Sequence, residues 1–168
     1  MYQRGAKHFI FLSRSGADNP SAAALLQALH ADPTVTTAVV RGSVTNLSDV
    51  HAAVAHAHHP LRGIVQAATT FHDRLFASMD THTWHAVIGP KVQGTINLLR
   101  ATHTLDFFIT TSSTIGVIGT PTQSHYAAAN AFLDTSPTTS LSLGMVVGLG
   151  HVVENPGKTL LLPCHRLM

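Results

Sequence analysis

The chain has 168 residues, of which 45% are hydrophobic and 11% charged, and its formal net charge is +2. This length and composition predict one globular domain with a buried core, and no apolar run is long enough to span a membrane. The apolar stretch near the N-terminus is too short for the core of a signal peptide. Basic residues are scattered and no aromatic platform accompanies them, so nothing in the sequence favours a nucleic acid as a partner.

The single cysteine, Cys164, allows no internal disulfide and is typical of a reducing compartment such as the cytoplasm. Thirteen histidines raise the question of a metal site. The clustered ones are His56, His58, His59, His82 and His85. Because they lack cysteine or carboxylate companions at ligand spacing, we interpret them as solvated residues and predict no metal.

Short apolar, β-branched runs alternate with segments whose apolar residues recur at helical spacing. In chain order we predict strands at residues 7–14, 34–42, 61–68, 105–113 and 139–150, and helices at 19–32, 46–59, 84–99 and around Tyr126. Asn19 or Ser21 is expected to cap the first helix, and Asn46 or Ser48 the second. This alternation predicts an α/β fold with a parallel sheet of about five strands and helices on both faces.

Polar segments follow four of the predicted strands. They read SRSG after the first strand, GSVTN after the second, QAAT after the third and TSS at the end of the fourth. Because ligands of such sheets bind beyond the carboxyl ends of the strands, these segments predict one site along a single edge.

Lys91 is the unusual residue of the long helix. The apolar stripe of that helix consists of Trp84, Val87, Ile88, Val92, Ile96 and Leu99. Lys91 lies on or beside the stripe, just past a Gly89-Pro90 pair at which we expect a break. Two interpretations remain open, because the lysine either reaches past the core to water or holds its ammonium near the strand ends.

Tyr126 and Asn130 are four residues apart in a helical segment and therefore share a face, while Ser113 ends the strand before them. A tyrosine at this place can simply pack on the sheet with its hydroxyl at the rim. Its phenol, with a pKa of about 10, donates a proton near neutrality only if a cation stabilises the anion. Lys91 can supply that cation, and Ser113 can bond the same carbonyl oxygen. Such a set suits the reduction of a carbonyl by hydride.

Four segments, in this order, carry a family resemblance: GAKHFIFLSRSG, GPKVQGTINL, FFITTSS and QSHYAAANAFLD. They closely resemble the ketoreductase domains of fungal highly reducing polyketide synthases, which are relatives of the short-chain dehydrogenases. The resemblance covers residues 1–157 and implies a Rossmann-like fold, with residues 158–168 as a divergent tail. It also implies NADPH as cofactor and a β-keto acyl group on an acyl carrier protein as substrate, within polyketide biosynthesis.

The resemblance assigns a role to each matched residue. Tyr126 would be the proton donor, Ser113 the donor that orients the substrate, Lys91 the group that lowers the tyrosine pKa, and Asn130 their support. Arg14 would bind the 2′-phosphate of NADPH. The full set of implied cofactor-binding residues is Ser13, Arg14, Ser43, Val44, Ala67, Lys91 and Tyr126.

The chain also departs from the family pattern. Its sequence contains no TGGxGGLG phosphate loop, so we expect a truncated domain whose first strand and Gly-rich loop are missing. Ser43-Val44 occupies the place where the family usually has Asp-Val, and residues 66–69, QAAT, occupy the place of the family's HAAG. Asp73 matches the last residue of the Leu-Asp-Asp signature for one hydride face, and Ile118 stands in place of the tryptophan of the other.

Two functional hypotheses follow. The chain is a ketoreductase that reduces a β-keto thioester with NADPH, or it is an inactive remnant or accessory protein that binds a partner polyketide synthase.

Overall fold

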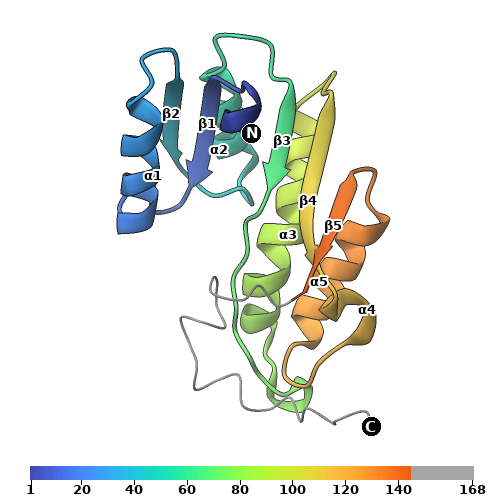
Figure 1. Ribbon diagram of the computed structural model, residues 1–168. Helices are drawn as coiled ribbons and strands as arrows, with labels where there is room; N and C mark the ends of the chain where they lie inside the picture. The colour runs from blue at the N-terminus through green and yellow to red at the C-terminus, as the bar shows by residue number, and fades with distance from the viewer. Residues whose placement is uncertain (145–168) are drawn as a thin grey trace, which may run out of the picture.

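The computed structural model describes residues 1–144, in which strands and helices alternate as the periodicity predicts (Figure 1). The elements are η1 (Tyr2–Arg4), β1 (His8–Ser13), α1 (Pro20–His30), β2 (Thr36–Arg41), α2 (Leu47–Ala55), β3 (Gly63–Gln66), η2 (Phe76–Ser78), α3 (Thr81–Ala101), β4 (Phe107–Ser113), α4 (Ile115–Ile118), α5 (Ser124–Thr135) and β5 (Thr139–Leu143). The expected boundary at residue 157, the tail and Cys164 lie outside the described residues.

Every pair of neighbouring strands is parallel, as predicted, but the strands form two sheets. β1 pairs with β2 from His8↔Thr36 to Ser13↔Arg41, and the second sheet has the order β3-β4-β5. The expectation of one continuous sheet is therefore wrong, because no ladder of hydrogen bonds joins β1 to β3 within residues 1–144. Figure 1 shows these two strands as the facing edges of the two sheets.

The helices begin where short polar side chains can accept the free N–H groups of a first turn. Asn19 Oδ1 accepts from Ser21 N at 2.9 Å, so Asn19 is the cap of α1. Asn46 caps α2 in the same way, and Asp80 caps α3 through a 2.6 Å bond from Thr83 N. Helix α1 packs against β2, and α2 packs against β1 and α3. Figure 1 shows α3 and α5 side by side behind β3–β4–β5.

Helix α3 is continuous through Pro90, so the expected break at Gly89-Pro90 does not occur. Its predicted apolar stripe is only partly correct, because Val87 is buried while the other five members are half-exposed. The remaining buried positions of α3 are small or polar and include Lys91, Gly94 and Asn97. None of the helices within residues 1–144 is both long and apolar enough to pass through a lipid bilayer.

Candidate active site

The candidate site lies where the parallel strands end. Ser13, Arg41, Gln66 and Ser113 are the last residues of β1, β2, β3 and β4, so the polar segments that follow them share the carboxyl edge, as the sequence predicts. This shared edge is where the fold presents side chains to a ligand.

Lys91 points from α3 toward β4 and is 3% exposed. Its Nζ donates a hydrogen bond to the Thr111 carbonyl oxygen at 2.8 Å. Burial lowers the pKa of Lys91 from 10.5 to about 8, and the charge of Asp134 opposes that shift. Of the two interpretations left open by the sequence, the ammonium held near the strand ends is the one observed.

Gln66 and Gly94 explain how this part of α3 approaches the sheet. The Gln66 side chain donates from Nε2 to the Pro90 carbonyl at 2.8 Å and accepts at Oε1 from Ala68 N at 2.9 Å. A Cβ on Gly94 would lie 2.9 Å from Gln66 Nε2 and 2.7 Å from Val44 Cγ1. The glycine therefore leaves room for the amide that ties the end of β3 to the residue preceding Lys91.

Tyr126 comes from the first turn of α5, and its ring centroid is 5.5 Å from Lys91 Nζ. The Phe71 ring lies 5.0 Å from the Tyr126 ring, at an interplanar angle of 44°. Within residues 1–144 the Tyr126 hydroxyl makes no hydrogen bond, so it is free to donate to a ligand. The Lys91 ammonium therefore lies near the Tyr126 ring, and its role toward the phenol stays a prediction.

Asn130 and Ser113 complete the predicted set. Asn130 is fully buried, and its Nδ2 donates to the Tyr126 carbonyl at 2.8 Å, while its Oδ1 has no partner among the described residues. Ser113 Oγ accepts from Ile115 N at 3.3 Å, which leaves its own hydrogen available. Ser113 and Tyr126 are not hydrogen-bonded to one another within residues 1–144.

The sequence analysis missed His125, which is 1% exposed and precedes Tyr126. Its Nδ1 accepts from Tyr126 N at 3.0 Å, and its Nε2 lies 2.8 Å from the His72 carbonyl oxygen, to which it donates. His125 thereby fixes the start of α5 against the loop after β3. No sequence pattern marked it, because its burial depends on the His72 carbonyl, which lies 53 residues earlier in the chain.

Asp134 is the second missed residue. It follows Asn130 by one helical turn, a spacing that the sequence displays. Its Oδ1 accepts from Ser140 Oγ at 2.5 Å and from Ser142 Oγ at 3.3 Å. Burial pushes the pKa of Asp134 up, but these hydroxyls, that of Ser112 and the charge of Lys91 outweigh burial and hold the pKa below its usual value.

The implied cofactor residues lie along the same edge. Ser43 N donates to Asp49 Oδ2 at 2.8 Å, and the Val44 carbonyl accepts from Asn97 Nδ2 at 3.0 Å, so both belong to the loop after β2. Ser13 ends β1, while Arg14 and Ala67 are exposed immediately after β1 and β3. The described residues bring Lys91, Tyr126, Ser113 and Asn130 together, while Arg14 makes no hydrogen bond or ion pair.

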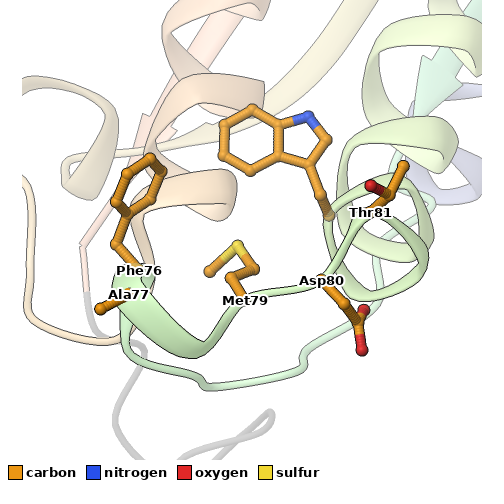
Figure 2. A pocket seen from close by; sticks show the side chains of 6 residues that line it. Phe76, Ala77, Met79, Asp80 and Thr81 are labelled. Carbon is orange, nitrogen blue, oxygen red and sulfur yellow. The ribbon is translucent and has the colours of Figure 1, made fainter.

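An open pocket of about 450 Å³ adjoins this region and is lined by Phe76, Ala77, Met79, Asp80, Thr81 and Trp84. Figure 2 shows the Phe76 and Met79 side chains on the same side of the loop before α3. The Trp84 ring is 6.4 Å from that of His125, which connects the pocket to the base of Tyr126. Asp73, at the other end of this loop, accepts from Gln123 Nε2 at 2.8 Å.

Within residues 1–144, no group of three or more His, Cys, Asp or Glu side chains is arranged to hold a metal ion. Of the clustered histidines, His59 packs its ring against that of His8, with 4.2 Å between the ring centroids.

The profile of the KR domain matches residues 1–149 of the chain. The chain belongs to the KR-domain family. It is 48% identical to a highly reducing polyketide synthase of Aspergillus sclerotiorum over 174 residues, and 45% identical to one of Pyrenophora dematioidea over 172 residues. Each match covers 93% of this chain and 7% of the relative, so the KR chain spans a small part of the curated relatives it matches.

Solved structures agree with this assignment. An A-type ketoreductase from a modular polyketide synthase superposes with a TM-score of 0.84 at 27% identity, over 94% of this chain and 36% of that one. The first-module ketoreductase of phoslactomycin biosynthesis from Streptomyces gives a TM-score of 0.74 at 29% identity, over 87% of this chain and 38% of that one. The predicted ketoreductase resemblance and the Rossmann-like parallel fold are therefore confirmed.

Proposed function

We propose that this KR chain carries the catalytic residues for the NADPH-dependent reduction of a β-keto thioester, held by an acyl carrier protein, to the β-hydroxy thioester. The observation that carries the proposal is the buried ammonium of Lys91 at 5.5 Å from the ring of Tyr126, whose hydroxyl is unbonded among the described residues. Membership of the KR-domain family supports the reaction class. The substrate carrier, the cofactor and a cytoplasmic location are part of the proposal.

The residues present fit the two ends of NADPH. Arg14 offers a guanidinium after β1 that is unpaired among residues 1–144 and can bind a phosphate, and the exposed Ala67 after β3 leaves the backbone open to a ribose. Ser13, Ser43 and Val44 would line the adenosine side of the same edge. When bound, NADPH would supply a hydride to the carbonyl carbon of the substrate.

The chain's own residues would complete the reduction with a proton. Ser113 Oγ donates a hydrogen bond to the carbonyl oxygen and orients it, and Tyr126 Oη gives its proton to that oxygen as the C=O bond becomes C–OH. Lys91 stabilises the phenolate that remains on Tyr126. Asn130 holds the backbone of that tyrosine through the bond to its carbonyl.

A Tyr126→Phe variant tests the proposal. The assay follows NADPH oxidation with a β-keto thioester, using a form extended at its N-terminus by a strand, Gly-rich loop and helix of the kind that the family resemblance implies. We expect Tyr126→Phe to lower kcat by about 10²–10⁴-fold. Tyr2→Phe is the matched control, because the Tyr2 hydroxyl donates to Asp32, before the amino end of β2 and away from the strand ends that carry the candidate site.

The outcomes separate the two hypotheses drawn from the sequence. Turnover that survives Tyr126→Phe contradicts the catalytic assignment. A folded extended form that binds NADPH without turning over substrate favours the non-catalytic accessory protein.

A further inference from the structure

Two arginines and one aspartate meet at the turn that follows β1. Ser13 and Arg41 are register partners at the carboxyl ends of β1 and β2, and Arg14 is the next residue of the turn. Arg41 Nη2 forms an ion pair with Asp18 Oδ1, and the two side chains are 62% and 60% exposed. The Arg14 side chain has no ionic or hydrogen-bonded partner in the part of the chain that the structure describes.

Gly16 allows the Arg41 side chain to lie on this turn. Gly16 has a φ of +58°, and a Cβ at this position would lie 3.1 Å from Arg41 Cγ and 3.2 Å from Arg41 Nε. The bond from Gly16 N to the Ser13 carbonyl closes the turn at 3.2 Å. The guanidinium of Arg41 is therefore held over the same few residues that carry Arg14.

In a dinucleotide-binding fold, the turn after this strand contacts the adenosine ribose of the dinucleotide. In folds of this type a carboxylate near the end of the neighbouring strand binds a free 2′-hydroxyl, whereas an arginine binds a 2′-phosphate. Here the carboxylate of the turn, Asp18, is engaged by Arg41. A phosphate monoester carries more negative charge than a carboxylate and accepts paired bonds from a guanidinium. An exposed ion pair contributes little to stability, so the exchange of partners costs little.

We propose that Arg41 is a second specificity residue for a 2′-phosphorylated adenosine, and that Asp18 occupies its guanidinium until the phosphate displaces it. The inference rests on the proposed function, since it concerns the cofactor of that site. In this proposal Asp18 and the 2′-phosphate compete for the guanidinium of Arg41. The outcome of that competition decides how strongly the chain prefers the 2′-phosphorylated nucleotide over the unphosphorylated one.

The test uses adenosine 2′-monophosphate and adenosine 5′-monophosphate as probes, because they report on the adenosine end alone. Binding to the 168-residue chain is measured by NMR titration. Arg41→Gln should weaken the binding of the 2′-monophosphate about five- to tenfold, because it removes one charge-assisted contact at an exposed site. Asp18→Asn should strengthen it about threefold, and both variants should leave the 5′-monophosphate unchanged.

Arg62→Gln is the matched control. It breaks an equally exposed pair, Arg62 Nε to Asp106 Oδ2 at 2.6 Å, at the opposite ends of the strands, and it removes the same charge. If Arg62→Gln weakens the binding of the 2′-monophosphate as much as Arg41→Gln does, the effect comes from the net charge of the chain and not from a contact of Arg41. That result overturns the proposal. An unchanged affinity in Asp18→Asn overturns the competition.

Two further variants cover the remaining outcomes. Arg41→Lys keeps the charge but loses the planar fork, so an intermediate affinity supports the proposal even if Arg41→Gln disturbs the turn. If Arg14→Gln abolishes the preference for the 2′-monophosphate while Arg41→Gln does not, the cofactor proposal stands and this inference fails. Turnover by the extended form is a separate readout, so failure of the reaction is distinguishable from failure of this site.

Discussion

Lys91 shows how far a single residue can be interpreted from sequence. Its position on the stripe of α3 indicated that it is unusual, but the sequence left open whether its ammonium reaches water. The answer depends on the Thr111 carbonyl, which accepts its hydrogen bond at 2.8 Å and belongs to a strand formed twenty residues later. The catalytic roles of Lys91, Tyr126, Ser113 and Asn130 stay predictions.

The lowered pKa of Lys91 predicts a pH-dependent stability. The folded state holds this proton less tightly than the unfolded state, with pKa values of about 8 and 10.5, so the unfolded state binds more protons between these values. Stability therefore rises as pH rises from about 8 to 10.5, by about 3 kcal/mol for this group. Below pH 8 the full cost of burying the ammonium is present.

Lys91→Met removes this dependence and is the variant to measure. We expect the free energy of unfolding of wild type minus that of Lys91→Met, from urea titrations, to be flat below pH 8 and to increase above it. Lys7→Met controls for the loss of a positive charge at a side chain that is 38% exposed. A difference that falls with rising pH would contradict the assignment of a buried charged lysine.

At the scale of the elements, hydrophobic periodicity predicted the order and type of the main strands and helices, and the short polar caps predicted where helices begin. It failed inside α3, where most of the expected apolar stripe is only half-buried. Asn97 is buried there because its side chain donates to the Val44 carbonyl at 3.0 Å. Periodicity counts apolar residues and has no information on which backbone carbonyl a helix will meet.

Gly94 is the position where α3 tolerates no side chain. A Cβ would overlap Val44 and Gln66, so Gly94→Ala must push α3 away from the end of β3. We expect Gly94→Ala to destabilise the chain by about 1–3 kcal/mol, measured by urea unfolding, and to shift the NMR signals of residues around Lys91.

Gly89→Ala, one turn earlier in α3, is the control. Its added Cβ would meet Thr45 Cγ2 at 3.4 Å, which is ordinary contact. Because the better helix propensity of alanine is offset by the crowding of its Cβ against the ring of the following Pro90, the free energy of unfolding should change by less than about 1 kcal/mol. If the two substitutions change the free energy of unfolding equally, close packing is not the reason for the glycine at position 94.

At the scale of the whole molecule, the two sheets are connected through α2 and α3 and not through a strand ladder. Val44, in the loop after β2, contacts Gly94 and accepts from Asn97 of α3. Local pattern predicts each strand, but which strands pair depends on contacts far apart in sequence. Within residues 1–144 the facing edges of β1 and β3 have no ladder partner, and such edges are of the kind that invites association with other chains.

The affinity of the 168-residue polypeptide for NADPH depends on how many hydrogen-bond donors it offers to the phosphates of the cofactor. A dinucleotide normally rests its pyrophosphate on a Gly-rich turn and a helix N-terminus, and no such turn precedes a helix in the described residues. Arg14 supplies one charge-assisted contact, worth about 1.5–3 kcal/mol at most, in place of several. A net loss of about 4 kcal/mol weakens binding about a thousandfold, which moves a micromolar Kd to the millimolar range.

We therefore expect the polypeptide of residues 1–168, tested alone, to bind NADPH with a Kd in the millimolar range and to show little turnover of a β-keto thioester. The extended form with a strand, Gly-rich loop and helix should bind NADPH in the micromolar range, measured by the change in NADPH fluorescence. A glycine-to-alanine change in the added loop should return the extended form toward the weak affinity, because the pyrophosphate needs close approach to the backbone. Micromolar binding by residues 1–168, together with turnover lost in Tyr126→Phe, would mean that Arg14 and the strand ends hold the cofactor without that loop.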